Sequence, residues 1–508
     1  MSDATVSAAL RSSARLVVIE APAGCGKTWQ GAQYAQEIAG TMGDGRVLIL
    51  AHTHAATDVF ASRTRGAGRR IEIRTIDSLI VQLASVYHRT LDLPPDTVAF
   101  ARSKKDGYGQ LAAKAANLLR TSPMISQSIA QRYPIIICDE HQDASADQHA
   151  VVMACHDAGA SVRVFGDPIQ MVYGSNKKVE IDANLRQWEE LKLKAGAFAE
   201  LDMPHRWLEG SEPLGRWILA AREALRSGQM VDLRSTLPQG VKIIFAQNQS
   251  PTQRSGYRLA PGEGRPIYEV VRATKSLLVL SRYNATVDAL HAWFGRQLPI
   301  WEGHVRERLA IFLDAMQGNT GNSSRIVQAV LVFLDGVATG FSRSAYGNIL
   351  LQEVSGGCLA RRSGKPAMLQ VLGRMILDQP DHKGVAKFLS RLNELIKTGP
   401  AFKNVKIDCP REFWDLIHLG QFDDASEGMA EISQRRTYCR PSPPTKAIST
   451  VHKAKGLECD DVIIMPCDAS NFSDTPAARS LLYVAMSRAR CSLTIVVSRS
   501  NPSPLVML

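Results

Sequence analysis

A short glycine-rich stretch near the start of the chain constrains the fold more than any other part of the sequence. The apolar run 16–19 and then Glu20 precede A-P-A-G-C-G-K-T at residues 21–28. A strand followed by such a turn is typical of a phosphate-binding loop, because Gly24 and Gly26 let successive backbone N–H groups point into one concave space beside a helix N-terminus. The sequence therefore predicts an α/β fold with a phosphate site. The alternative is an ordinary strand-to-helix turn that happens to contain these glycines.

The residues of this stretch have separate expected roles around a bound nucleotide. Lys27 would reach the β- and γ-phosphates, and the Thr28 hydroxyl would hold Mg²⁺. The general phosphate-loop pattern begins with glycine, whereas this chain has Ala21 at that position. The predicted nucleotide-binding residues are Ala21, Pro22, Ala23, Gly24, Cys25, Gly26, Lys27 and Thr28.

A second apolar run delivers two carboxylates to the expected ligand edge of the sheet. The apolar residues 135–138 are followed by Asp139 and Glu140, and the carboxyl ends of parallel strands open on one edge. Asp139 is placed to hold Mg²⁺ through water, and Glu140 to orient or deprotonate the water that attacks a γ-phosphate. This pattern indicates a nucleoside triphosphatase. A helix N-cap is the alternative role for such acids, and Asp143 is a candidate for it.

The length and the charge of the chain narrow the class of protein. A chain of 508 residues is too long for one hydrophobic core, so we expect two or more domains. Its 60 basic and 49 acidic residues give a net charge of +11, which suits a polyanionic partner, although a solvated basic surface is the alternative. No run approaches the roughly 18 apolar residues of a membrane span, and the start lacks a secretory signal, so we expect a cytoplasmic protein without membrane partners.

The cysteines are scattered along the chain without any C-x-x-C pair. This spacing argues against a disulfide framework and against a structural zinc site. We therefore expect most of the thiols to be small apolar fillers of the core.

Short apolar runs that end in small polar residues recur along the chain and predict further strands. They lie at 46–50, 71–74, 134–138, 161–165, 241–245, 276–280, 447–451, 462–465 and 492–497. Between them, residues 79–130 and roughly 305–436 have helical periodicity. The Pro-rich run 441–445 predicts a linker.

Five motifs occur in a fixed order. The phosphate loop fits A-x-A-G-x-G-K-T, in which alanine leads, and D-E-H-Q-D at 139–143 fits D-E-x-Q-D. The remaining three are G-D-P-I-Q-M-V-Y-G at 166–174, T-V-H-K-A-K-G-L-E at 450–458 and L-L-Y-V-A-M-S-R-A-R at 481–490. By these motifs the chain resembles the superfamily 1 DNA helicases of the UvrD/Rep type. The resemblance implies two RecA-like P-loop motor domains with parallel sheets, each carrying a small, mostly helical insertion.

The resemblance also implies a division of the chain into four parts. The first motor domain would comprise residues 1–78 and 131–205, with a helical insertion at 79–130. The second motor domain would comprise residues 206–304 and 445–508, with a mostly helical insertion at 305–444. Both insertions look small for such helicases, and no nuclease motif follows the last helicase motif.

On the nucleotide side, the resemblance assigns roles to residues outside the phosphate loop. Gln170 would sense the γ-phosphate and couple it to DNA, while Arg206 and Arg488 would reach the same phosphate from the second motor domain. His205 takes the position of the adenine-stacking tyrosine, and Glu458 would hold the ribose. The alternatives are surface ion pairs for the two arginines and a helix-start charge for the glutamate.

The residues expected to face DNA match the family less well. A-H-T-H-A-A-T at 51–57 stands where the family has T-F-T-N-K-A-A, and T-I-D-S-L at 75–79 stands where it has T-F-H-S-F. His52 and His54 could stack on bases, or bind a metal through their H-x-H spacing. The candidate DNA-binding residues are His52, Thr53, His54, Thr75, Ser78, Tyr173 and His452.

The resemblance implies an ATP-dependent single-stranded DNA translocase and helicase that moves 3′ to 5′ and uses ATP with Mg²⁺. Its expected partners are single-stranded or tailed duplex DNA and a nuclease of the OLD type, since the compact chain is similar to the helicase-like subunit of the Gabija anti-phage system. A repair helicase, an RNA-directed motor, and an ATPase that senses nucleotide or DNA ends and gates a nuclease with little unwinding are alternatives. No adenine-reading glutamine segment is evident in residues 1–15, which leaves the base selectivity open.

Overall fold

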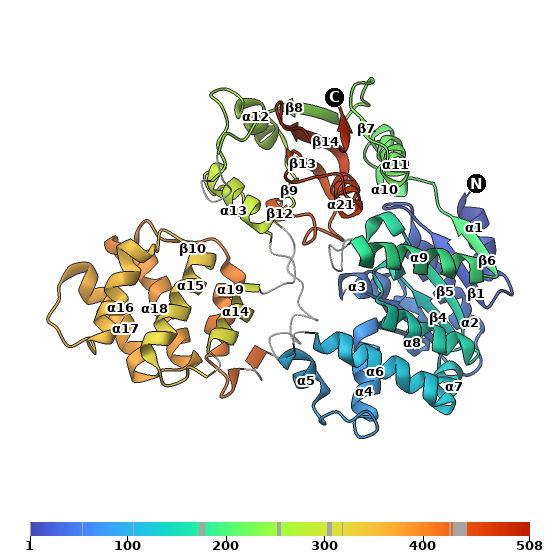
Figure 1. The fold of residues 1–508 in the computed structure, drawn as a ribbon, viewed down its shortest axis with the longest axis horizontal. Helices are drawn as coiled ribbons and strands as arrows, with labels where there is room; N and C mark the ends of the chain where they lie inside the picture. The colour runs from blue at the N-terminus through green and yellow to red at the C-terminus, as the bar shows by residue number, and fades with distance from the viewer. Residues whose placement is uncertain are drawn as a thin grey trace. The chain divides into compact units, whose positions relative to one another are not determined.

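The chain forms two compact units (Figure 1). The computed structural model describes residues 2–52, 54–104, 106–171, 178–250, 256–301, 307–316, 318–425, 428–429 and 444–508. The first unit comprises Met1–Pro251, Arg258–Asn284 and Thr450–Leu508, and the second comprises Thr252–Tyr257 and Ala285–Ser449. This division does not test the four-part division above, which stays a prediction.

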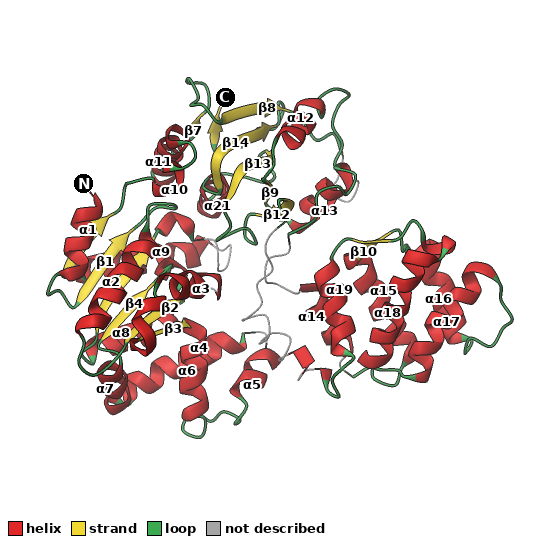
Figure 2. Cartoon of the chain, turned by 180° about the vertical axis from the view of Figure 1, so that it is seen from behind, coloured by secondary structure: helices red, strands yellow, loops and turns green. Residues whose placement is uncertain are grey.

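The first unit contains a six-stranded parallel sheet that carries the glycine-rich loop (Figure 2). Its strands follow the order β3 (Ile71–Thr75), β2 (Val47–Ala51), β4 (Ile135–Cys138), β5 (Ser161–Gly166), β1 (Leu16–Glu20) and β6 (Ala197–Glu200). All neighbouring strands run parallel, so the segments that follow them open on one edge. Only β5 separates β1 from β4, which brings the segments after these two strands close together.

Both faces of this sheet are covered, which explains the continuous apolar runs of its central strands. Leu16 and Val18 of β1 belong to one buried hydrophobic cluster, whereas Val17 and Ile19 belong to another. Successive residues of a strand point to opposite faces, so the two clusters lie on the two sides of the sheet. The helices of this part of the chain are α1 (Ser2–Arg11), α2 (Lys27–Thr41), α3 (His54–Arg63), α8 (Ala146–Asp157) and α9 (Lys178–Lys194).

Four helices lie between β3 and β4 in the chain, where the periodicity of residues 79–130 predicts helices. They are α4 (Ile76–Val86), α5 (Thr97–Ser103), α6 (Gly107–Thr121) and α7 (Pro123–Arg132). Leu79 of α4 and Leu111 of α6 belong to the same buried cluster as Leu16 of β1. The four helices therefore share the core on one face of the sheet. We call the six-stranded sheet with these helices the first lobe.

The same unit contains a second parallel sheet, which with its helices forms the second lobe. Within the unit its strands follow the order β9 (Leu277–Ser281), β13 (Cys459–Cys467), β14 (Ala489–Val497) and β8 (Val241–Phe245). Its helices are α10 (His205–Leu208), α11 (Glu212–Arg226), α12 (Arg265–Ala273) and α21 (Pro476–Met486), and β7 (Val231–Asp232) pairs with β15 (Val506–Met507). The two parallel sheets confirm the predicted α/β fold class and are consistent with RecA-like P-loop domains.

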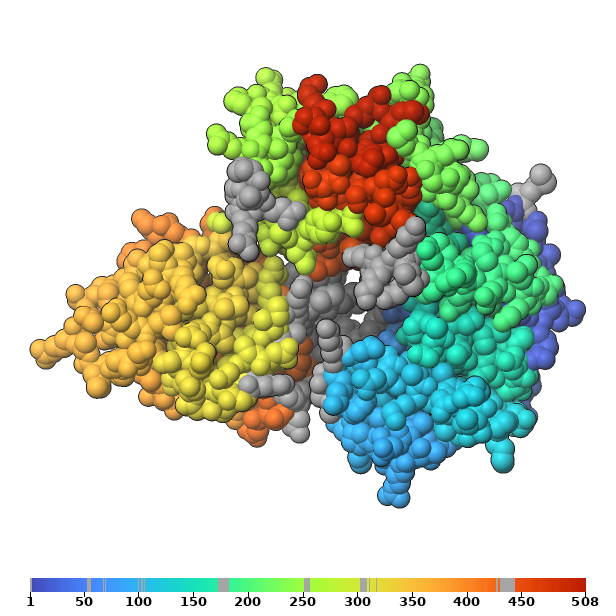
Figure 3. Space-filling model, viewed as in Figure 1, coloured from blue at the N-terminus to red at the C-terminus, as the bar shows by residue number. Residues whose placement is uncertain are grey.

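The second unit is mostly helical and has its own core. Figure 3 shows its surface in yellow and orange. Its elements include α14 (Glu307–Met316), α15 (Ser323–Val337), α16 (Asn348–Ser355), α17 (Gly364–Asp378), α18 (His382–Thr398) and α19 (Pro410–Leu419), and a short pair of strands, β10 (Ala338–Thr339) and β11 (Lys406–Ile407). The aromatic side chains of Phe333, Phe388 and Phe413 are buried in its centre. α13 (Asn284–Trp293) and β12 (Lys446–Thr450) span the boundaries between the units. No helix in the described parts of the chain is long and apolar enough to cross a membrane.

Candidate nucleotide-binding site

The glycine-rich loop connects the buried strand β1 to α2. Gly24 and Gly26 have φ angles of 73° and 86°, in the left-handed region that favours glycine. α2 begins at Lys27 directly after Gly26, without a side-chain cap on its first turn. The N–H groups of that first turn therefore remain open to an anion, and the helix dipole adds positive potential there.

Position 24 needs glycine for a second reason, which is that α10 packs closely against the loop. The Arg206 backbone N–H donates to the Gly24 carbonyl oxygen at 2.9 Å. A Cβ on Gly24 would lie 2.7 Å from the Arg206 Cβ and 3.0 Å from the Trp207 ring. Only glycine allows this approach, so the segment that leads into the second lobe lies directly against the phosphate loop.

Lys27 and Glu140 form an ion pair at the carboxyl edge of the sheet. Glu140 follows β4 with φ 53° and ψ 36°, an uncommon conformation for a residue with a side chain. Gln142 Nε2 donates to the Glu140 Oε2 at 2.6 Å. Burial opposes ionisation of Glu140, but the charges of Lys27 and Lys455 outweigh it and hold the pKa of the carboxyl well below its usual range. Glu140 is therefore a carboxylate at neutral pH.

Asp139 is buried beside this pair. Burial raises the pKa of Asp139 to about 6. The charge of Lys27 opposes this rise, and the charge of Glu140 adds to it. Its Oδ1 atom is buried and has no hydrogen-bond partner, which is costly unless a ligand takes that place. A carboxylate oxygen of this kind, with the Thr28 hydroxyl on the first turn of α2, fits the oxygen ligands that Mg²⁺ prefers.

Gln170 lies at the same edge, after β5, but its side chain is held within the first lobe. The side-chain Nε2 donates to the Asp167 Oδ2 at 2.9 Å. The backbone carbonyl oxygen of Gln170 accepts from the Lys455 Nζ at 2.9 Å. The predicted γ-phosphate contact would use the amide hydrogen that Asp167 does not accept, or would require the amide to leave Asp167. That role of Gln170 stays a prediction.

A buried network of charges ties α11 to the ends of β1 and β5. Arg222 Nη2 lies 2.8 Å from the Glu20 Oε1 and 2.8 Å from the Asp167 Oδ1. The three side chains are almost completely buried, and Arg226 Nη1 donates to the Glu20 Oε1 at 2.5 Å. Because α11 packs on β14 and α21 of the second lobe, this network joins the two lobes next to the phosphate loop.

We expect Arg222→Met to destabilise the first unit by about 3 to 5 kcal/mol, because the change leaves the buried Asp167 carboxylate without its cation and Glu20 with Arg226 in place of two arginines. The matched control is Arg216→Met on the same helix. Arg216 forms an exposed pair with Glu212 at 2.6 Å, and losing such a pair costs about 0.3 to 0.5 kcal/mol. Urea denaturation of both variants measures the difference, and equal midpoints would contradict a structural role of the network.

Arg206, Glu458 and Ser487 meet beside the loop. Arg206 Nη2 donates to the Glu458 Oε1 at 2.7 Å, and its Nη1 donates to the Ser487 carbonyl oxygen at 2.5 Å. Burial raises the pKa of Glu458, but the charges of Arg206 and Arg488 outweigh it and keep that pKa below its usual value. The structure thus brings two of the predicted residues together as an ion pair.

Arg488 is almost completely buried. It donates to the carbonyl oxygens of Val484 and Leu457 at 3.0 and 3.3 Å and to the Ser487 Oγ at 2.7 Å. Burial and the neighbouring charge of Arg206 lower the pKa of Arg488 to about 10. It is therefore positively charged at neutral pH but is held by its own lobe, and its contact with a phosphate stays a prediction.

His205 lies beside the loop, on the side of Gly26. A Cβ on Gly26 would lie 3.0 Å from the His205 Cδ2. The ring is partly exposed, and its Nε2 lies 2.8 Å from the Asp3 Oδ2 of α1. The imidazole is thus next to the loop, and its stacking on a base stays a prediction. Asp3 was missed by the sequence reasoning because α1 itself was not predicted.

The structure gives local positions for some of the residues predicted to face DNA, and their contact with DNA stays a prediction. Thr75 is the N-cap of α4: its Oγ1 accepts from the Ser78 N–H at 3.2 Å, and the Ser78 Oγ donates to the Thr75 carbonyl at 2.8 Å. Both residues thus stabilise a helix start. Thr53 and Tyr173 lie outside the described residues, as does the side chain of His54, the first residue of α3.

His52 and His452 are both partly buried near Lys455. Burial, helped by the charge of Lys455, lowers the pKa of His52 to about 4. Burial and the charges of Arg282 and Lys455 also lower the pKa of His452. Both rings are therefore neutral at pH 7, the form that stacks without a charge. Among the described residues, no group of three or more His, Cys, Asp or Glu side chains could hold a metal ion.

Asp143 is not a helix cap, so that interpretation is wrong. Ser145 caps α8 through a capping box with Gln148. The Asp143 Oδ2 instead accepts from the Lys455 Nζ. Lys455, Tyr483 and Asp167 are site residues that the sequence reasoning missed: the Tyr483 hydroxyl accepts from the Ala23 N–H at 2.9 Å. All three lie in the motifs at 166–174, 450–458 and 481–490. Membership of these motifs is the signal by which the sequence could have identified them.

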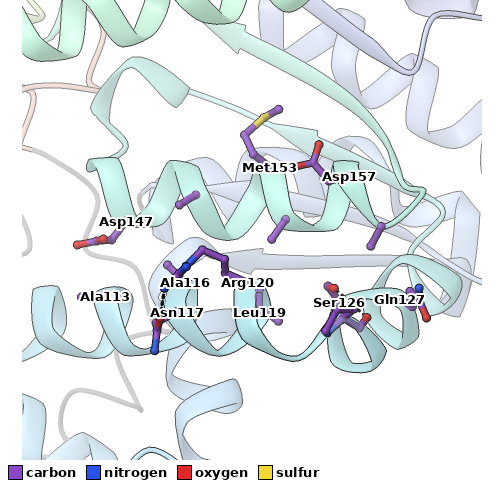
Figure 4. Close-up of a pocket in the computed structure, with 14 residues that line it drawn as sticks. Ala113, Ala116, Asn117, Leu119, Arg120, Ser126, Gln127, Asp147, Met153 and Asp157 are labelled. Atoms are coloured by element: carbon purple, nitrogen blue, oxygen red, sulfur yellow. Dashed lines mark hydrogen bonds between the residues drawn. The ribbon is translucent and has the colours of Figure 1, made fainter.

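A groove of about 700 Å³ lies away from this site, between α6, α7 and α8 (Figure 4). Small side chains such as Ala116 and Ala154 line it together with Asp147 and Asp157, and Arg120 donates to the Asn117 Oδ1 at 2.7 Å on its wall. None of the predicted nucleotide or DNA residues lines it.

Models of two known protein families match the chain, one in each lobe. Residues 3–193 match the model of an AAA domain, and residues 447–496 match the model of a UvrD-like helicase C-terminal domain. The first match includes Lys27, Asp139 and Glu140, and the second includes Glu458 and Arg488. A search of curated proteins found no match to the chain. Together the two regions support a helicase-type ATPase of the UvrD/Rep kind.

Proposed function

We propose that the chain is an ATP-dependent translocase and helicase that moves on single-stranded DNA. The observation that carries the proposal is the Lys27–Glu140 ion pair beside Asp139, whose Oδ1 atom has no hydrogen-bond partner among the described residues, with Arg206 of the second lobe resting on the phosphate loop. A triphosphatase needs a phosphate-binding lysine, a metal-binding carboxylate and a base, and Lys27, Asp139 and Glu140 have the side chains that suit these roles.

In this proposal the nucleotide phosphates compete with Glu140 for the Lys27 ammonium. Lys27 then neutralises charge on the transferring phosphoryl group, and the released Glu140 carboxylate orients the attacking water and accepts its proton. Mg²⁺, held by Thr28 and Asp139, would neutralise negative charge on the phosphate oxygens. Arg206 and Arg488 add positive charge from the second lobe once Arg206 exchanges Glu458 for phosphate. Glu458 is then free to bind the ribose.

Movement on DNA would follow from the position of the site between two lobes. Several contacts that join the lobes, among them those of Arg206 and Tyr483, involve the phosphate loop itself. Nucleotide binding and hydrolysis therefore change the contacts that hold the lobes together, and a cycle of such changes can drive a motor. The net charge of +11 suits the DNA phosphates.

The finer parts of the proposal come from the resemblance: 3′ to 5′ movement, DNA rather than RNA, and action beside a nuclease in anti-phage defence or, alternatively, in repair. An ATPase that only gates a nuclease is the second candidate. The changes at residues 51–57 and 75–79 favour it, because His52, Ile76 and Leu79 stand where the family has phenylalanines, and the loss of aromatic rings weakens stacking on bases.

We expect the purified chain with ATP and Mg²⁺ to displace the labelled strand of a duplex with a 3′ single-stranded tail. Duplexes with a 5′ tail or with blunt ends should remain intact, and single-stranded DNA should stimulate ATP turnover more than single-stranded RNA does. Turnover without displacement would favour the gating ATPase. The absence of both ATP turnover and strand displacement would contradict the proposal.

A further inference from the structure

A carboxylate oxygen of α1 lies near the phosphate loop without a hydrogen-bond donor. The Asp3 Oδ2 lies 2.8 Å from the His205 Nε2. The Asp3 Oδ1 is buried and has no hydrogen-bond partner among the described residues. A buried acceptor without a donor costs free energy. The carboxyl group of Asp3 therefore suits a ligand that brings N–H groups to this position.

The distance of Asp3 from the loop limits what that ligand can be. The His205 ring lies against Gly26, where an added Cβ would be 3.0 Å from the His205 Cδ2, and α2 starts at the next residue with open N–H groups. A nucleotide held at that helix start has its base only a ribose away from the phosphates. A side chain that is one contact away from Gly26 is therefore within reach of the base.

The two side chains are also open to a ligand. His205 and Asp3 are 40% and 35% exposed. The terminal torsion of an aspartate is soft, so a small rotation of the exposed Asp3 side chain turns its buried oxygen toward a ligand. Each carboxylate oxygen has two lone pairs, so Asp3 can accept from a base and keep its contact with His205.

The N-terminal helix holds this carboxylate in place. α1 packs on β6 and α2, and it buries Val6 and Leu10 in the core of the first lobe. The Ser2 hydroxyl donates to the Asp202 carboxylate and accepts from the Asp202 N–H at 3.1 Å. Asp202 lies in the segment between β6 and α10. Asp3 is thus fixed relative to the loop before a nucleotide binds, which lowers the cost of ordering it.

The chemistry of a carboxylate distinguishes between the purine bases. The Watson–Crick edge of guanine presents the N1–H and the 2-amino group next to each other, and both are donors. Adenine presents its 6-amino donor next to the N1 acceptor. A carboxylate only accepts hydrogen bonds, so it pairs with the guanine edge and is repelled by the adenine N1. Hydrogen bonds to a charged acceptor are also stronger than neutral ones.

We propose that Asp3 is a specificity-determining residue that recognises guanine, and that GTP is a better substrate of this chain than ATP. The Asp3 carboxylate accepts hydrogen bonds from the guanine N1–H and 2-amino group. The proposal rests on the proposed function, since it requires triphosphate hydrolysis at the loop, and it deepens that function by naming the preferred base.

The test measures phosphate release by the purified chain from GTP, ATP, inosine triphosphate (ITP) and xanthosine triphosphate (XTP). We expect kcat/KM for GTP to exceed that for ATP and to exceed by about 10- to 100-fold that for ITP, which lacks only the 2-amino group, because one hydrogen bond to a charged group is lost. In Asp3→Asn the amide accepts and donates, which matches the N1–H and the 2-carbonyl of xanthine. This variant should lose its preference for GTP and use XTP better than the wild type does.

Asp44→Asn is the matched control, because Asp44 is an exposed aspartate before β2, at the amino end of that strand. It should keep the wild-type order of substrates. A wild-type chain that uses ATP or ITP as efficiently as GTP, or an Asp3→Asn variant with an unchanged order of substrates, would overturn the recognition of guanine by Asp3. If Asp3→Asn does not fold, the comparison of GTP, ITP and ATP in the wild type decides. A wild-type chain that hydrolyses none of these triphosphates would instead refute the proposed function.

Discussion

Replacing Lys27 with alanine is expected to lower nucleotide turnover by at least about 100-fold, the size of effect seen when one preorganised charge or donor is removed from a reaction site. Lys27 is the first residue of α2 and reaches the carboxylates after β4. Without its ammonium, the loop retains only backbone N–H groups to neutralise the phosphates. Steady-state release of phosphate from ATP with and without single-stranded DNA measures the loss.

The control for this variant is Lys114→Ala. Lys114 is also a lysine of the first lobe, but it donates to the Leu91 carbonyl oxygen at 2.6 Å, in the helices between β3 and β4. Its removal should leave turnover within about twofold of the wild type, as for most substitutions away from a site. Undiminished turnover in Lys27→Ala would refute the assignment of the phosphate site and, with it, the proposed function.

Replacing Glu140 with glutamine is expected to reduce kcat by about 10²- to 10⁴-fold, the usual contribution of a general base, while nucleotide binding is retained or strengthened. The amide cannot accept a proton from the attacking water. It also no longer pairs with Lys27 as an anion, so the phosphates meet less competition for the ammonium. Single-turnover hydrolysis and equilibrium binding of a fluorescent ATP analogue separate the two effects.

Glu37→Gln serves as the control for the charge change. Glu37 lies on α2 as well, where it forms a partly exposed pair with Arg11, and its substitution should leave both kcat and affinity unchanged. A Glu140→Gln variant that loses binding and retains its rate per bound nucleotide would show that Glu140 shapes the loop rather than acting on water.

The strands and the loop of the first lobe could be predicted because their signals are local. β1, the glycine turn and α2 follow each other without interruption, and β4 is a run of apolar residues that two acids follow directly. Such elements are specified by residues next to each other in the sequence. Their register in the sheet then brings Lys27 and Glu140 together, although they are 113 residues apart.

The contacts between the lobes could not be predicted, because each joins residues far apart in the chain and depends on how two sheets are placed. The Asp143–Lys455 pair spans 312 residues and the Glu20–Arg222 pair spans 202. An isolated charge in a sequence carries no signal for such a partner. Short edge elements were missed for a different reason: β6 has only one fully buried residue among its four, so its apolar signal is weak.

The way in which the second unit is inserted also bears on engineering. Its main segment leaves the first unit after Asn284 and returns at Thr450, and the Val451 N–H is bonded to the Ser281 carbonyl, so the two junctions are neighbours. A body whose ends meet in this way can be exchanged for another at a small loop-closure cost. Chimeras that graft a different helical body between these junctions would keep the first unit with its candidate nucleotide site.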